Sequence, residues 1–103
     1  MKLGCNTVLF NQLDVYGALQ HISWAGYDGA ELAFLGNMAQ HLELKTDQAY
    51  VEEVKSIARK HRLELYATEA SIGGATEEEK IKAAVKIFEV ASRLSIPVIA
   101  IGS

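Results

Sequence analysis

Three polar residues of the 103-residue chain stand where they could bind a small molecule, and they are Asn6, Glu31 and Glu69. Glu31 stands out because it is a lone acid in the otherwise apolar stretch Ala30–Phe34. A carboxylate in a mostly buried strand is unfavourable unless it is paired or hydrogen-bonded. Glu31 therefore either contacts a bound ligand or pairs with a lysine, an arginine or backbone amides.

Asn6 and Glu69 both fall near the end of a predicted strand. Asn6 lies toward the carboxyl end of the first strand, where it either contacts a ligand or caps the local backbone. Glu69 opens the loop predicted after the third strand, and a loop acid is either a substrate contact or simply solvated. In a barrel of parallel strands, this carboxyl-terminal rim is where binding sites are built.

The remaining reactive side chains do not form a constellation. His21, His41 and His61 are spread over two predicted helices and an irregular loop, whereas a metal site needs ligands that converge on one point. Only His41 is expected near the rim. Cys5 is the only cysteine, so it can form neither an internal disulfide nor a cysteine metal site, and we expect it to be a small buried residue. No residue is assigned a catalytic or metal-ligating role.

The composition is that of a globular chain. Hydrophobic residues make up 50% and charged residues 22%, with a net charge of −3 and a pI near 5.5. An acidic chain without basic clusters argues against a nucleic-acid partner. No apolar run approaches the roughly 20 residues of a transmembrane helix. The amino terminus lacks a signal core, and together with the single cysteine this predicts a cytoplasmic protein without a membrane partner.

Hydrophobic periodicity predicts alternating strands and helices. Strands are expected at Lys2–Phe10, Ala30–Leu35, Leu63–Thr68 and Val98–Ile101. The first helix begins after the cap Asp14 and stops at Gly26, the second begins at Thr46 or Asp47, and the third runs from Thr76 to near Leu94. The apolar face of the third helix is expected to consist of Ile81, Ala84, Val85, Phe88 and Ala91.

This order predicts a parallel sheet with right-handed crossovers. The fold class is therefore α/β, a parallel (βα)3β unit, with residues 1–103 forming a single domain. Two architectures fit the pattern: an open doubly wound sheet, or half of a TIM (β/α)8 barrel. The first and fourth strands would have open edges, and such edges tend to recruit another strand. We therefore expect a homo-oligomer.

Three stretches resemble one known family. Gly26-Tyr27-Asp28-Gly29-Ala30-Glu31-Leu32 resembles the "glycine, aromatic, Asp, small, apolar, Glu, Leu" stretch of the xylose-isomerase-like sugar phosphate isomerase/epimerase barrels. Lys2–Thr7 and Leu63–Ala67 look like the first and third strands of the same family. The resemblance covers nearly the whole chain but only the amino-terminal half of the barrel.

The resemblance implies a (βα)8 fold and a divalent metal, Mn²⁺, Mg²⁺ or Zn²⁺. It also implies isomerisation or epimerisation of a sugar or sugar phosphate by proton transfer beside a carbonyl. The family's Glu, Asp, His and Glu ligands come from later strands, so this chain alone is expected to bind no metal. Related apurinic-site endonucleases use histidines at the ends of the third and fourth strands. Thr68-Glu69 and Gly102-Ser103 stand there in this sequence, which weakens the endonuclease reading.

Two classes of function remain open. The first, implied by the resemblance, is the amino-terminal portion of a metal-dependent sugar isomerase or epimerase. In such a barrel the side chain of Glu31, on the strand face opposite Leu32, would point into the cavity and accept hydrogen bonds from a polyol or support a metal ligand, and Asn6 would bind a sugar hydroxyl. The alternative is a non-enzymatic half-barrel that self-associates or serves as a binding module. A doubly wound sheet that binds a small molecule is a weaker reading, because Leu9–Asp14 offers no glycine-rich loop.

Overall fold

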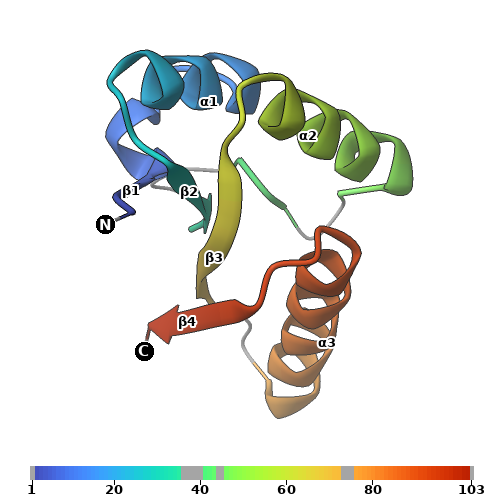
Figure 1. The fold of residues 1–103 in the computed structure, drawn as a ribbon. Coiled ribbons are helices and arrows are strands. Elements are labelled where there is room, and N and C mark those ends of the chain that lie inside the picture. The colour runs from blue at the N-terminus through green and yellow to red at the C-terminus, as the bar shows by residue number, and fades with distance from the viewer. Residues whose placement is uncertain (1, 36–40, 44–45, 73–75, 103) are drawn as a thin grey trace.

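The computed structural model describes residues 2–35, 41–43, 46–72 and 76–102. Within these residues, strands and helices alternate as the sequence predicts (Figure 1). The strands are β1 (Gly4–Asn6), β2 (Gly29–Phe34), β3 (Glu64–Ser71) and β4 (Val98–Gly102). The helices are α1 (Val15–Trp24), α2 (Gln48–Lys60) and α3 (Glu77–Arg93), and a short 3-10 helix, η1 (Thr7–Phe10), follows β1.

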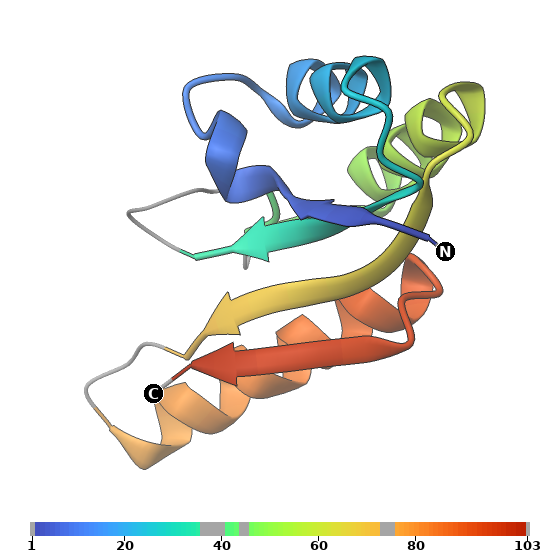
Figure 2. The same ribbon diagram turned by 60° about the vertical axis from the view of Figure 1, so that its left-hand side comes forward.

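The four strands form one parallel sheet in the order β1-β2-β3-β4. A doubly wound sheet contains a point where the strand order reverses, and here the order follows the sequence throughout. This arrangement decides between the two architectures in favour of a half-barrel. Figure 2 shows the twisted sheet with α1 and α2 side by side above it and α3 beside β3 and β4.

Side-chain alternation divides the sheet into two faces. One face packs against the helices and carries the buried core residues Cys5, Ala30, Leu32, Phe34 and Ala70. The register places Gly4 and Asn6 of β1 beside Gly29 and Glu31 of β2, and Ala33 of β2 beside Glu69 of β3. These residues define the opposite side of the sheet, which we call the inner face.

Helix boundaries follow local capping chemistry. The side chains of Asp14, Asp47 and Thr76 each accept a hydrogen bond from a backbone N–H in the first turn of the helix that follows. The α1 segment ends before Gly26, whose φ of 91° is the left-handed conformation that suits glycine. The predicted caps and this helix stop are therefore confirmed.

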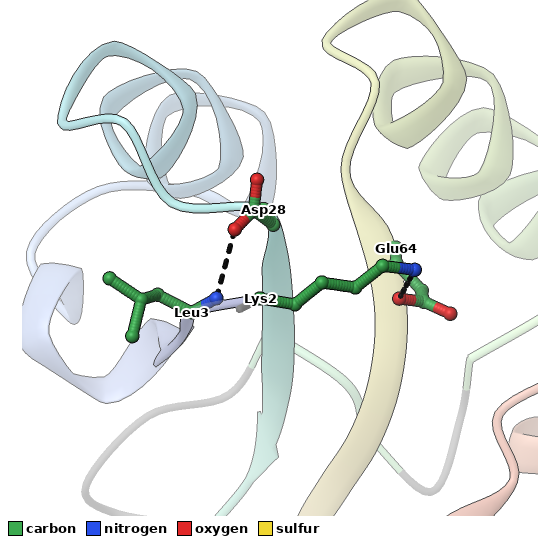
Figure 3. A network of polar contacts seen from close by, with 4 residues as sticks. All are labelled: Lys2, Leu3, Asp28 and Glu64. Carbon is green, nitrogen blue, oxygen red and sulfur yellow. Dashed lines mark hydrogen bonds and ion pairs between the residues drawn. The ribbon is translucent and has the colours of Figure 1, made fainter.

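An aspartate ties the start of β1 to β2 at the amino end of the sheet. The Asp28 carboxylate accepts a hydrogen bond from the Leu3 backbone N–H at 2.9 Å, and the Asp28 N–H donates to the Leu3 carbonyl at 2.7 Å. Lys2 reaches across to Glu64 at the start of β3, with 3.3 Å between Nζ and Oε2 (Figure 3). The Asp28 side chain therefore has a structural role in this part of the fold.

All four strands differ from their predicted bounds by one residue or more, and the largest differences are at the ends of β1 and β3. The first strand stops at Asn6 because the Asn6 side chain accepts a hydrogen bond from Val8 N at 2.8 Å and so caps η1. The third strand continues to Ser71 because it stays in register with both neighbours, pairing Glu69 with Ala33 and with Ala100. Glu69 consequently lies in a strand, and the predicted loop position was wrong.

The predicted apolar face of α3 was also largely wrong. The side chains that the helix buries are Ala83, Ile87, Val90 and Ala91. The exposed fractions of Ile81, Val85 and Phe88 are 62%, 53% and 52%. The helix carries two apolar faces, and helical periodicity alone does not distinguish the one that packs on the sheet.

Candidate functional site

Asn6 and Glu69 meet on the inner face of the sheet, although they come from strands separated by β2. Asn6 Nδ2 donates a hydrogen bond to Glu69 Oε1 at 2.8 Å. The amide oxygen of Asn6 is already used by Val8 N, so both ends of the amide are fixed. The resulting bridge spans β2, where Asn6 pairs with Glu31 and Glu69 pairs with the small residue Ala33.

Glu31 lies on the same face, directly beside Asn6 in the register of β1 and β2. Its side chain is half-buried, whereas Leu32 on the helix face is fully buried. Across the described ranges, the side chain of Glu31 makes no hydrogen bond and no ion pair, whereas its backbone is part of the sheet. The described residues therefore do not supply the lysine, arginine or backbone partners that the structural alternative requires. Its carboxylate oxygens are available to a ligand on the inner face.

Tyr66 completes this cluster, and sequence reasoning did not single it out. The register of β2 and β3 shifts between Ala30 and Glu31, which pair with Leu65 and Ala67. Tyr66 is therefore an extra residue of β3 that has no partner in β2. Its ring lies over Gly4 and close to Gly29, since a Cβ on Gly4 would stand 2.3 Å from Tyr66 Cε1 and one on Gly29 would stand 3.0 Å from Cδ1. Burial raises the pKa of Tyr66, and the nearby charge of Glu31 raises it further.

A signal for Tyr66 exists in the sequence. Glycine inside a strand often marks a place where another group approaches the backbone closely. Gly4 and Gly29 occupy equivalent positions of adjacent strands, and together they leave a trough for one large side chain. Recognising the trough requires the register of three strands, which only the structure provides.

His41 lies beyond the carboxyl ends of the strands but is built into the packing there. It is 4% exposed, and its Nε2 lies 2.9 Å from the carbonyl oxygen of Leu13. The hydroxyl of Tyr50 donates a hydrogen bond to the His41 carbonyl. His21 and His61 lie in α1 and at the end of α2, so the three histidines remain apart.

The described residues do not form a metal site. Among them, no group of three or more His, Cys, Asp or Glu side chains is close enough to hold a metal ion. Glu31 and Glu69 are the acids of the inner cluster, and Glu69 is engaged by Asn6. This donor set does not fit the four-ligand site that the resemblance implies. None of the helices in the described ranges is long and apolar enough to cross a membrane.

Solved structures of longer enzymes contain the fold of this chain. The chain resembles the probable 3-DHS dehydratase AsbF involved in petrobactin synthesis from Bacillus anthracis, with a TM-score of 0.73 and 18% sequence identity over 100% of this chain. It also resembles the 3-keto-D-glucoside 4-epimerase YcjR from E. coli, with a TM-score of 0.65 and 23% identity over 96% of this chain. Neither the protein-family models nor the curated proteins give a match.

The chain spans 38% of the length of the first of these structures and 36% of the second. At these identities the likeness establishes the fold. In the residues that the structure describes, the chain is thus an α/β half-barrel of four parallel strands and three α-helices, as the sequence predicts.

Proposed function

We propose that this half-barrel is the amino-terminal part of a sugar-modifying enzyme, an isomerase or epimerase of sugars or sugar phosphates. In this proposal the inner face of β1–β3 forms part of the wall that binds the substrate. The observation that carries the proposal is the cluster of Asn6, Glu31 and Glu69 on one face, with Glu31 unpaired among the described residues. The two similar structures, a probable dehydratase and an epimerase, support the coarser class of a sugar-modifying enzyme, and the epimerase supports the finer one.

The cluster suits the hydroxyl groups of a polyol. A carboxylate only accepts hydrogen bonds, so Glu31 binds the O–H of a ligand. Glu69 has one oxygen engaged by Asn6 and a second that can accept another hydroxyl. Because Asn6 and Glu69 already hold one another, they require little ordering when a ligand arrives. We therefore assign Asn6, Glu31 and Glu69 to substrate binding and none of them to proton transfer.

The proposed reaction moves a proton at a carbon beside a carbonyl, and such a step needs a positioned base. The resemblance also implies a divalent metal, Mn²⁺, Mg²⁺ or Zn²⁺, for the complete enzyme. We propose that the later strands of the complete barrel supply both the base and the metal ligands. The buried free thiol of Cys5 is compatible with the reducing cytoplasm that we propose as the location.

Ligand titration followed by NMR tests the proposal directly. The protein is titrated with D-xylulose and with xylitol while the resonances of β1–β3 are followed. Glu31→Gln is expected to weaken binding about tenfold or more, because hydrogen bonds to charged groups contribute roughly 1.5–3 kcal/mol. Glu89→Gln removes an exposed acid of α3 and serves as the matched control. Equal binding by the wild type and Glu31→Gln would contradict the proposal.

A second candidate function is a half-barrel that self-associates without catalysis. The observation that favours it is exposed apolar surface on the outer parts of the fold. Ile81, Val85 and Phe88 of α3 are exposed, and so are Val98 and Ile101 of the edge strand β4. A second copy of four strands would complete the eight of a barrel. Intact mass followed by light scattering distinguishes the two: a 103-residue chain that forms a dimer supports self-association.

A further inference from the structure

Tyr66 stands beside the proposed binding residues but has no role in the function described above. Its side chain extends from β3 over β2 to β1, since its Cδ1 lies near Gly29 and its hydroxyl lies over Gly4. A Cβ on Gly4 would stand 2.5 Å from Tyr66 Cζ and 2.6 Å from the hydroxyl oxygen, closer than real Cβ atoms come. Two glycines are therefore needed to accommodate this ring.

We propose that Tyr66 is a ligand-positioning residue whose ring forms the floor of the site and whose hydroxyl donates a hydrogen bond to a polyol hydroxyl that Glu31 also binds. This inference rests on the proposed function, because it names a further contact of the same ligand. The ligand class is a compound with adjacent hydroxyl groups, such as a sugar or a sugar alcohol.

The chemistry of the two side chains is complementary. A ligand hydroxyl both donates and accepts, so it is fully satisfied by one acceptor and one donor. Glu31 supplies the acceptor, and the Tyr66 O–H supplies the donor. Burial and the charge of Glu31 both raise the pKa of Tyr66, so the phenol keeps its proton throughout the physiological range.

The ring of Tyr66 also limits how far the proposed binding site extends toward the amino ends of the strands. A pocket of about 290 Å³ lies at the amino ends of β1–β3, and Gly4, Gly29 and Tyr66 are among its lining residues. Asn6 and Glu31 follow Gly4 and Gly29 by two residues on the same face, toward the carboxyl ends. The ring of Tyr66 therefore stands between this pocket and the binding cluster. A ligand bound by Asn6, Glu31 and Glu69 is held at the carboxyl-terminal side of the ring.

The test compares two substitutions that act on Tyr66 in different ways. Tyr66→Phe keeps the ring and removes the donor, whereas Gly4→Ala keeps every polar group and forces the ring out of its trough. Tyr27→Phe is the control for loss of a tyrosine hydroxyl elsewhere. Each protein is labelled with ¹³Cζ-tyrosine and titrated with xylitol, and thermal unfolding establishes that each variant is folded.

We expect xylitol to shift the Tyr66 resonance of the wild type and Tyr66→Phe to weaken xylitol binding about 3- to 10-fold, the value of one net hydrogen bond. Gly4→Ala is expected to weaken binding as well, and Tyr27→Phe to leave it unchanged. If Tyr66→Phe binds xylitol as the wild type does while Glu31→Gln does not, the role of Tyr66 is overturned and the proposed function stands. If the wild type binds neither xylitol nor D-xylulose, both are overturned.

Discussion

The side-chain amide of Asn6 donates a hydrogen bond to the carboxylate of Glu69 at 2.8 Å, although the two residues are 63 positions apart in the sequence. This bond connects β1 to β3 across the inner face of β2. The amide oxygen of Asn6 at the same time caps η1. One side chain thus ends the first strand and holds the third. The same contact arranges the polar part of the inner face before any ligand is present.

Asn6→Ala is expected to destabilise the protein by about 1–2 kcal/mol, because it removes both a helix cap and a hydrogen bond to a charged group. Glu69→Gln keeps an oxygen that can accept from Asn6, so its loss is expected to be roughly 0.5 kcal/mol or less. Urea unfolding of the two variants and the wild type measures both values. Similar losses in the two variants would contradict this account, because Glu69→Gln leaves both the cap and an acceptor for the Asn6 amide in place.

Asp28→Ala is expected to lower the free energy of unfolding by about 1 kcal/mol, since it leaves the Leu3 backbone N–H without its side-chain acceptor. Asp28→Asn retains an acceptor oxygen at the same place and is expected to lose less than half of that. Hydrogen exchange of the Leu3 amide provides a local readout, with faster exchange in the alanine variant. Unchanged exchange at Leu3 would contradict the role assigned to Asp28.

Gly26→Ala isolates the conformational requirement at the end of α1. A Cβ at this position would have no atom within 4 Å, so the substitution creates no clash. The φ of 91° nevertheless disfavours any residue with a Cβ, and the expected loss of stability is roughly 1 kcal/mol. Gly26→Asn should lose less, because asparagine tolerates left-handed conformations better. Thermal unfolding of the three proteins gives the order; an alanine variant as stable as the wild type would contradict the argument.

The raised pKa of Tyr16 predicts how the free energy of unfolding changes at alkaline pH. Its hydrogen bond to Glu53 is the main cause that raises its pKa to about 12, from an ordinary value of 10.0. Between these two pH values the unfolded chain loses the phenol proton while the folded protein keeps it. The contribution of Tyr16 is therefore complete below pH 10 and is lost as the pH rises through about 12. Urea unfolding between pH 9 and 11.5 should show a smaller decline for Tyr16→Phe than for the wild type. An identical decline would show that this bond does not persist in solution.

Local chemistry made much of the fold predictable from sequence. Asp14, Asp47 and Thr76 mark helix starts because a short polar side chain satisfies backbone N–H groups within a few residues. Gly26 marks a helix end for an equally local reason. The alternation of Leu32 with Glu31 correctly indicated which side of β2 faces the core.

Non-local geometry accounts for what the sequence did not predict. Asn6 ends β1 through its contact with Val8, and Glu69 remains in β3 because strands on both sides pair with it. The position of Tyr66 depends on the register of three strands. On α3 the sequence contains two apolar faces, and only the sheet determines that Ile87 is buried while Phe88 is exposed.

The exposed face of α3 provides the last prediction. Ile81, Val85 and Phe88 follow one another at intervals of four and three residues, so they line one side of the helix. Contiguous exposed apolar surface commonly marks an interface. If a second copy covers this stripe, the wild type forms a dimer at micromolar concentrations, and Phe88→Lys is expected to convert it to a monomer.

Glu89→Lys is the matched control, because it introduces the same side chain at the neighbouring exposed position outside the stripe. Size-exclusion chromatography with light scattering gives the mass of each protein, and circular dichroism verifies that each is folded. A dimer that persists in Phe88→Lys would show that the stripe is not the contact, which would leave the open edges of β1 and β4 as the means of association. A wild-type monomer would instead remove the self-associating half-barrel as a candidate function.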